Sequence, residues 1–168
     1  MEGYVEYLVK KKFSTSDKIK AVSIYFVLAA ICGFIGMSPL GWPSALVVLV
    51  FGIYVAHRLS TGLSKEFEYI LTNDHLDVDM ITAGRSRKRL CSFDIEAVEL
   101  CARISNPDRK GEMNRSFTKV IQAASAPDSK DAYFVIFSGE QGINMLVFEP
   151  DDRIIDGMSL YARSKIFK

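Results

Sequence analysis

The stretch "EFEYILTNDHLDVDMI", residues 66–81, alternates apolar and polar side chains on both sides of a central Asn73-Asp74 pair. Alternation with a period of two predicts β-strands, and an Asn-Asp pair can adopt the positive φ angles of a two-residue hairpin turn. With this turn, Leu71 faces Leu76 and the apolar side chains of both strands lie on one face. A register shift of one residue would move them all to the other face. The stretch therefore predicts an antiparallel β-hairpin.

Five further short apolar segments follow this hairpin, separated by turn residues. They are RKRLCSF (87–93), EAVELCA (96–102), TKVIQAAS (118–125), AYFVIFS (132–138) and INMLVFE (143–149). Seven short strands in succession favour an antiparallel meander that curls into a barrel-like sheet.

The last segment, residues 150–168, changes to a helical period. It opens with Pro150 and two acidic residues, which suit the positive end of a helix dipole. One apolar stripe follows, formed by Ile154, Met158, Tyr161 and Ala162. Such a stripe predicts an amphipathic C-terminal helix that caps the curled sheet.

Upstream of the strands, residues 21–56 contain no Asp, Glu, Lys, Arg or His. Two apolar runs, 21–37 and 45–56, flank the helix-breaking segment SPLGWPS. A helix rises about 1.5 Å per residue and a bilayer core is about 30 Å thick, so the sequence predicts a two-helix transmembrane hairpin over residues 21–58. Because the second run is short, a re-entrant hairpin remains the alternative.

Charges around this hairpin predict its orientation. The connecting loop is uncharged, whereas Lys10, Lys11 and Lys12 precede the first run and Arg58 follows the second. The positive-inside rule therefore places both termini in the cytoplasm, in a cytoplasmic-membrane protein with two spans. Residues 1–20 are expected to be a basic cytoplasmic segment. Within it, a helical face of Tyr4, Val5, Leu8 and Val9 favours a short amphipathic helix on the membrane surface.

Composition excludes several classes of function. The net charge is +1, so the chain lacks the positive field that non-specific nucleic-acid binding needs, and no nucleic acid is expected as a partner. Three cysteines without CxxC spacing and two histidines do not form a zinc ligand set. We find no nucleophile, base and orienting group at a recognisable spacing. We therefore expect no enzyme activity, no metal and no cofactor.

The segment "RSRKRLCSFDIEAVEL", residues 85–100, carries a family resemblance. A basic run, a strand and a D-I-x-x-V-x-L pattern (Asp94, Ile95, Val98 and Leu100) are similar to bacterial PH-like (pleckstrin-homology-like) domains. The whole chain resembles a family of small bacterial membrane proteins with a two-helix hairpin and a PH-like domain. The resemblance implies a PH-like domain over residues 59–168, with seven antiparallel strands and a capping helix. It implies no established activity.

Three functions follow as hypotheses. The first is a membrane-anchored scaffold that binds another membrane protein or itself, with the loop Ser105–Asn114 as its surface. The second is an anionic lipid-headgroup binder, for which the candidate contacts are Arg85, Arg87, Lys88 and Arg89. The acidic strands around the 72–75 turn count against the headgroup pocket of eukaryotic PH domains. A third option is an accessory subunit of a transport or envelope-stress complex, packed through Gly33 and Gly36.

The strand pattern also predicts a structural use for the basic run. Arg87 and Arg89 fall on the same sheet face as the acidic residues of the 66–81 hairpin. Opposite charges on neighbouring strands stabilise a sheet by roughly 0.2–1 kcal/mol per pair. We therefore expect Arg89 to form a solvated cross-strand ion pair with Asp79, which leaves Arg85 and Lys88 for a ligand.

Overall fold

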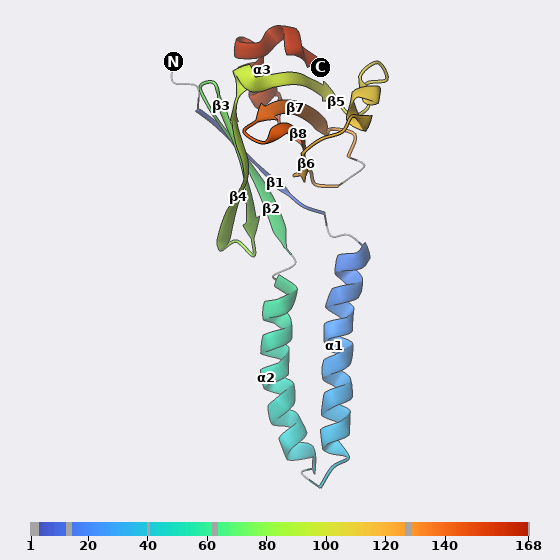
Figure 1. Ribbon diagram of the computed structural model, residues 1–168. Coiled ribbons are helices and arrows are strands. Elements are labelled where there is room, and N and C mark those ends of the chain that lie inside the picture. Colours follow the sequence, from blue (N-terminus) through green and yellow to red (C-terminus); the bar gives the residue numbers. More distant parts are fainter. Residues whose placement is uncertain (1–3, 13–14, 40, 62–63, 127–128, 168) are drawn as a thin grey trace. The chain divides into compact units, whose positions relative to one another are not determined.

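The computed structural model describes residues 4–12, 15–39, 41–61, 64–126 and 129–167 (Figure 1). The chain forms two compact units, a helical one and a β-rich one.

The helical unit consists of α1 (Thr15–Gly36) and α2 (Gly41–Thr61). The helices pack against each other at Gly52, where a Cβ atom would overlap the Leu28 side chain. Most of their large apolar side chains are exposed, as expected for surfaces that lipid covers. Both helices are long and apolar enough to cross a membrane, which supports the predicted association with a membrane.

The first sheet of the β-rich unit has the order β1-β2-β3-β4. Its strands are β1 (Tyr4–Lys10), β2 (Lys65–Thr72), β3 (His75–Thr82) and β4 (Ser86–Asp94). The two-residue turn predicted between β2 and β3 is confirmed, with Asn73 at a φ of 54°. Leu71 and Leu76, on either side of this turn, are both buried in the core.

Strand β1 corrects the prediction of an amphipathic helix at the N-terminus. It pairs antiparallel with β2, so that Tyr7 lies opposite Tyr69 and Lys10 opposite Glu66. Within this segment Val5, Tyr7 and Val9 alternate with a period of two and pack toward the core, whereas Tyr4 and Leu8, which belonged to the expected helical face, are exposed. Pairing with β2 therefore stabilises a strand in place of the helix. The hairpin α1–α2 is therefore inserted between two paired strands of the β-rich unit, which does not begin at residue 59.

The second sheet has the order β6-β8-β7-β5-β9. Its strands are β5 (Val98–Arg103), β6 (Lys119–Gln122), β7 (Tyr133–Gly139), β8 (Gly142–Phe148) and β9 (Ile166–Phe167). Strands β5, β7 and β8 pair antiparallel, but β6 runs parallel to β8 and β9 runs parallel to β5. The described residues thus form nine strands in two sheets. The seven predicted strands are all present, but the predicted count of seven, the simple antiparallel meander and the single barrel-like sheet are wrong.

The main core lies between the two sheets and α3 (Asp152–Ala162). Tyr69 joins the sheets at its centre, because its hydroxyl donates to the Ala123 carbonyl (2.5 Å) and accepts from the Glu149 amide (3.2 Å). Burial raises the pKa of this hydroxyl, which therefore stays protonated.

Helix α3 begins as the sequence predicts. The Asp151 side chain accepts a hydrogen bond from the Ile154 amide at 3.1 Å, and so caps the helix. The residues that pack into the core are Ile154, Ile155, Met158 and Ala162. Tyr161, which was expected in the apolar stripe, is exposed, and Ile155 takes its place.

Candidate functional site

The basic run lies on β4 and on the turn that precedes it. The ion pair predicted between Arg89 and Asp79 is confirmed, and Arg89 Nη1 also lies 2.6 Å from Asp77 Oδ1. Arg87 forms a second pair, with its Nη2 atom 2.8 Å from Glu68 Oε2. Two of the four candidate cations are therefore neutralised by carboxylates of β2 and β3.

These pairs are less solvated than expected. The side chains of Glu68 and Asp79 are only 4% and 2% exposed, whereas those of Arg87 and Arg89 are about half exposed. The hydrogen bond to Asp79 raises the pKa of Arg89, so its charge is permanent. Desolvation raises the pKa of Glu68, against the opposing effect of Arg87, and a hydrogen bond shared with Glu6 raises it further. The arginines thus cover buried carboxylates.

The other two cations, Arg85 and Lys88, are exposed. Neither has an ion pair within the described part of the chain. Arg85 follows Ala83 and Gly84, both with positive φ, in the turn between β3 and β4. The structure therefore does not gather the four cations into one phosphate-binding pocket, and their contact with a headgroup stays a prediction.

A polar constellation at His75 was missed by the sequence analysis. The ring nitrogens of His75 lie 2.6 Å from Asp94 Oδ1 and 2.7 Å from Ser92 Oγ. A carboxylate, an imidazole and a hydroxyl thus contact one another in the same sequence as in a catalytic triad. The Ser92 hydroxyl, however, donates its hydrogen bond to Asp77 Oδ1 (2.6 Å) and not to His75. The hydroxyl is thus directed at a carboxylate, and the network ties β3 to β4. In the sequence, His75 is 17 positions from Ser92 and 19 positions from Asp94, and the register of β3 and β4 brings them together.

The loop Ser105–Asn114, the candidate interaction surface, covers a second apolar cluster. Met113 and Phe117 pack against the outer face of the second sheet, where Phe134 and Ile136 are fully buried. The Arg109 guanidinium lies 4.3 Å from the centre of the Phe167 ring. Met113 and Arg109 are therefore engaged in packing, whereas most residues of the loop are exposed.

A cleft lies beside the edge strands of the two sheets, which do not pair with each other. Strand β4 ends the order of the first sheet and β6 ends that of the second, so each has a free edge. We call the space beside these edges the seam cleft; its volume is about 360 Å³. It is lined by Leu90, Cys91, Ser92, Thr118, Lys119, Ile121, Phe137, Gly139, Glu140, Gln141 and Asn144. No sequence signal indicated it, because it depends on how two sheets meet.

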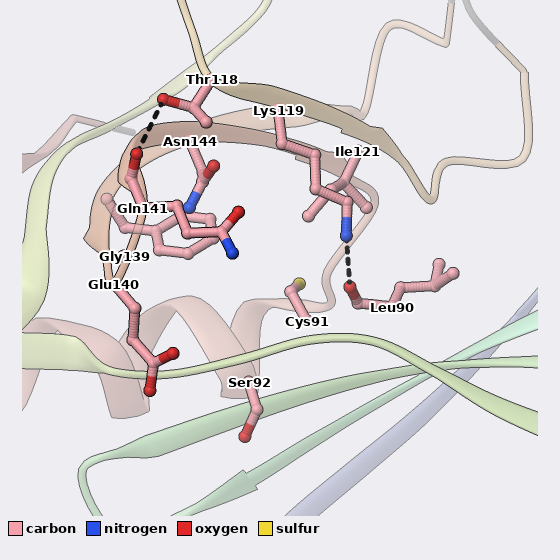
Figure 2. A pocket seen from close by; sticks show the side chains of 11 residues that line it. Leu90, Cys91, Ser92, Thr118, Lys119, Ile121, Gly139, Glu140, Gln141 and Asn144 are labelled. Carbon is pink, nitrogen blue, oxygen red and sulfur yellow. Dashed lines mark hydrogen bonds between the residues drawn. The ribbon is translucent and has the colours of Figure 1, made fainter.

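The seam cleft has an apolar floor and a polar rim. Lys119 of β6 reaches across and donates to the Leu90 carbonyl of β4 at 3.3 Å (Figure 2). Ile121 and Phe137 belong to the main core and form the floor of the cleft, although they are only 6% and 3% exposed. Burial raises the pKa of the Cys91 thiol to about 12, so this thiol is a packing group and a poor nucleophile.

Metal-ligating side chains do not cluster in the part of the chain that the structure describes: it contains no group of three or more His, Cys, Asp or Glu residues suited to a metal ion.

Comparison with known proteins gives one result. No curated protein and no solved structure matches the chain. The family model described as "Bacterial PH-like domain (DUF6106)" matches residues 1–168. This span contains both long apolar helices and the whole β-rich unit, including the strand that precedes the hairpin. The chain therefore belongs to the bacterial PH-like domain family DUF6106.

Proposed function

We propose that this protein is a membrane-anchored PH-like module that acts without catalysis, by binding another protein at the cytoplasmic surface. The seam cleft is the observation that carries this proposal. Two strand edges beside an opening into the core provide both backbone hydrogen-bonding groups and apolar surface, which are the requirements for binding an extended protein segment.

The insertion of the hairpin supports anchoring with both ends on one side of the membrane. Strands β1 and β2 pair with each other although α1 and α2 separate them in the chain. Paired strands occupy one compartment, so the two helices either both cross the membrane or neither crosses. Lys10, Lys11 and Lys12 before α1, and Arg58 near the end of α2, favour the cytoplasm as that compartment.

Affinity purification of the full-length protein from native membranes, after brief crosslinking, tests protein binding. We expect a second protein to be recovered in constant proportion. Recovery of the chain alone, as a monomer in mild detergent, would refute the proposal.

Binding of anionic headgroups is the second candidate function. The exposed Arg85 and Lys88, which have no ion pair among the described residues, favour it. About 1 kcal/mol per basic residue near an anionic surface makes two cations a weak determinant. A vesicle flotation assay can use a variant in which a short Gly-Ser loop replaces residues 13–64, because Lys10 and Glu66 are register partners. If replacing both cations by Gln abolishes flotation with anionic vesicles, headgroup binding becomes the better function.

A further inference from the structure

We propose that the free edge of β4 pairs with an extended, acidic segment of the partner protein, which adds a strand to the first sheet and places an apolar side chain in the seam cleft. This inference rests on the proposed function, and it names the binding surface and the chemistry of the partner.

The backbone of β4 offers the first argument. The Leu90 carbonyl points away from β3, since it accepts a hydrogen bond from Lys119 of β6. In a regular antiparallel strand the N–H and C=O of one residue point to the same side, and every second residue repeats this direction. Strand β4 ends the order of the first sheet, so those residues of its regular part whose backbone groups point away from β3 direct them to an edge that no described strand covers. An added strand would satisfy these groups and would compete for the Leu90 carbonyl with a single, exposed lysine.

The cleft itself offers the second argument. Its volume of about 360 Å³ lies within the 300–1,000 Å³ that is usual for binding pockets. Ile121 and Phe137 contribute the apolar floor, beside the Cys91 thiol, and Asn144 and Gln141 contribute polar side chains to the lining. Figure 2 shows Cys91, Ile121, Gln141 and Asn144 around this space. Successive side chains of a strand alternate between faces. A segment paired with β4 would therefore direct every second side chain toward this floor.

The lysine side chains beside the seam cleft favour an acidic partner segment. Lys88 shares a strand face with Leu90, and Lys119 stands on the opposite wall; neither has an ion pair among the residues that the structure describes. Glu140 is the acidic residue in the lining. A second copy of β4 would bring its own Arg87, Lys88 and Arg89 against these cations, and like charges on neighbouring strands are destabilising. An acidic segment is attracted instead.

Selection of peptides against the full-length protein in lipid nanodiscs tests this inference. The probe is a displayed library of random octapeptides. We expect enrichment of sequences in which Asp or Glu alternates with apolar residues. A synthetic enriched peptide should lose binding when alternate backbone amides are N-methylated, because the methyl groups prevent strand pairing. Its addition should slow hydrogen exchange in β4.

Variants locate the site. Lys88→Glu and Lys119→Glu should each weaken binding of the enriched peptide about three- to tenfold, because each charge reversal replaces an attractive cross-strand pair by a repulsive one. Lys130→Glu is the matched control, since Lys130 is exposed in the turn before β7, at the end of that strand opposite Gly139. It should change binding less than twofold.

Three results would overturn the inference. The first is that the selection enriches basic or proline-rich peptides, or enriches no peptide. The second is that the N-methylated peptide binds as well as the unmodified one. The third is that Lys88→Glu and Lys130→Glu weaken peptide binding equally. Purification from native membranes with the Lys88→Glu/Lys119→Glu variant separates it from the proposed function. If the variant recovers the same partner as the wild type, the protein-binding function stands and the β4 site fails. If the wild type recovers no partner, the function itself fails.

Discussion

Replacement of Arg89 by Gln tests whether the basic run is structural. Arg89 is bonded to Asp79, whose side chain is 2% exposed, and to Asp77. Breaking a buried ion pair costs about 3–5 kcal/mol, and an exposed one about 0.2–1 kcal/mol. Arg89 is half exposed, and Arg87 Nη1 stays 3.7 Å from Asp79 Oδ2, so we expect a loss of about 1–3 kcal/mol. With a urea m-value of roughly 2 kcal/mol/M, this lowers the unfolding midpoint by about 0.5–1.5 M.

Pulse proteolysis in urea on the detergent-solubilised chain measures this midpoint. Lys88→Gln is the matched control, because it removes a cation from the neighbouring position and breaks no ion pair among the described residues; its effect should stay within about 0.5 kcal/mol. In an Asp79→Asn background the Arg89→Gln replacement should cost less, since no buried carboxylate is left alone. Equal costs in both backgrounds, or equal effects of the two Gln variants, would refute the reasoning.

Three further predictions concern the core of the β-rich unit. Tyr69→Phe leaves two backbone groups without their hydrogen-bond partner and should lower the free energy of unfolding in urea by about 2–4 kcal/mol. Tyr7→Phe is the control: the Tyr7 hydroxyl forms no hydrogen bond among the described residues, so its loss should cost less than about 0.5 kcal/mol. Burial acts to raise the pKa of Glu149, but hydrogen bonds from two serines outweigh it and hold the pKa below 4.5. Its stabilising contribution is thus complete above the unfolded pKa and is lost as the pH falls through the lower folded pKa, and a Glu149→Gln variant should lack this part of the acid sensitivity in a pH series of midpoints. Gly157→Val should destabilise by about 1–3 kcal/mol in the same assay, because a Cβ atom at this position would lie 2.5 Å from Leu71 Cδ2 in the core; unchanged stability would show that α3 can move away from β2.

Local patterns in the sequence predicted the individual elements. The uncharged run over residues 21–56 became two long apolar helices, because length and hydropathy are properties of one continuous segment. The Asn73-Asp74 turn and the alternation around it became β2 and β3, because adjacent strands joined by two residues have few alternatives. The ion pair between Arg89 and Asp79 followed from the same alternation, which places both side chains on one face of the sheet.

Non-local pairing decided the rest. The segment Tyr4–Lys10 suits an amphipathic helix and a strand equally well, and β2, more than fifty residues away in the sequence, selects the strand. A meander would place β6 beside β7, but β8 lies between them. Local sequence patterns do not specify this strand order, so the predicted meander was wrong. The burial of Glu68 and the free edges of the seam cleft arise from how strands and sheets meet in space. The sequence determined the elements and their charges, and it predicted that Arg85 and Lys88 lie outside the cross-strand ion pairs. The tertiary structure alone determined that the paired carboxylates are buried and that the edges of β4 and β6 lie beside a cleft, because both depend on contacts between residues far apart in the chain.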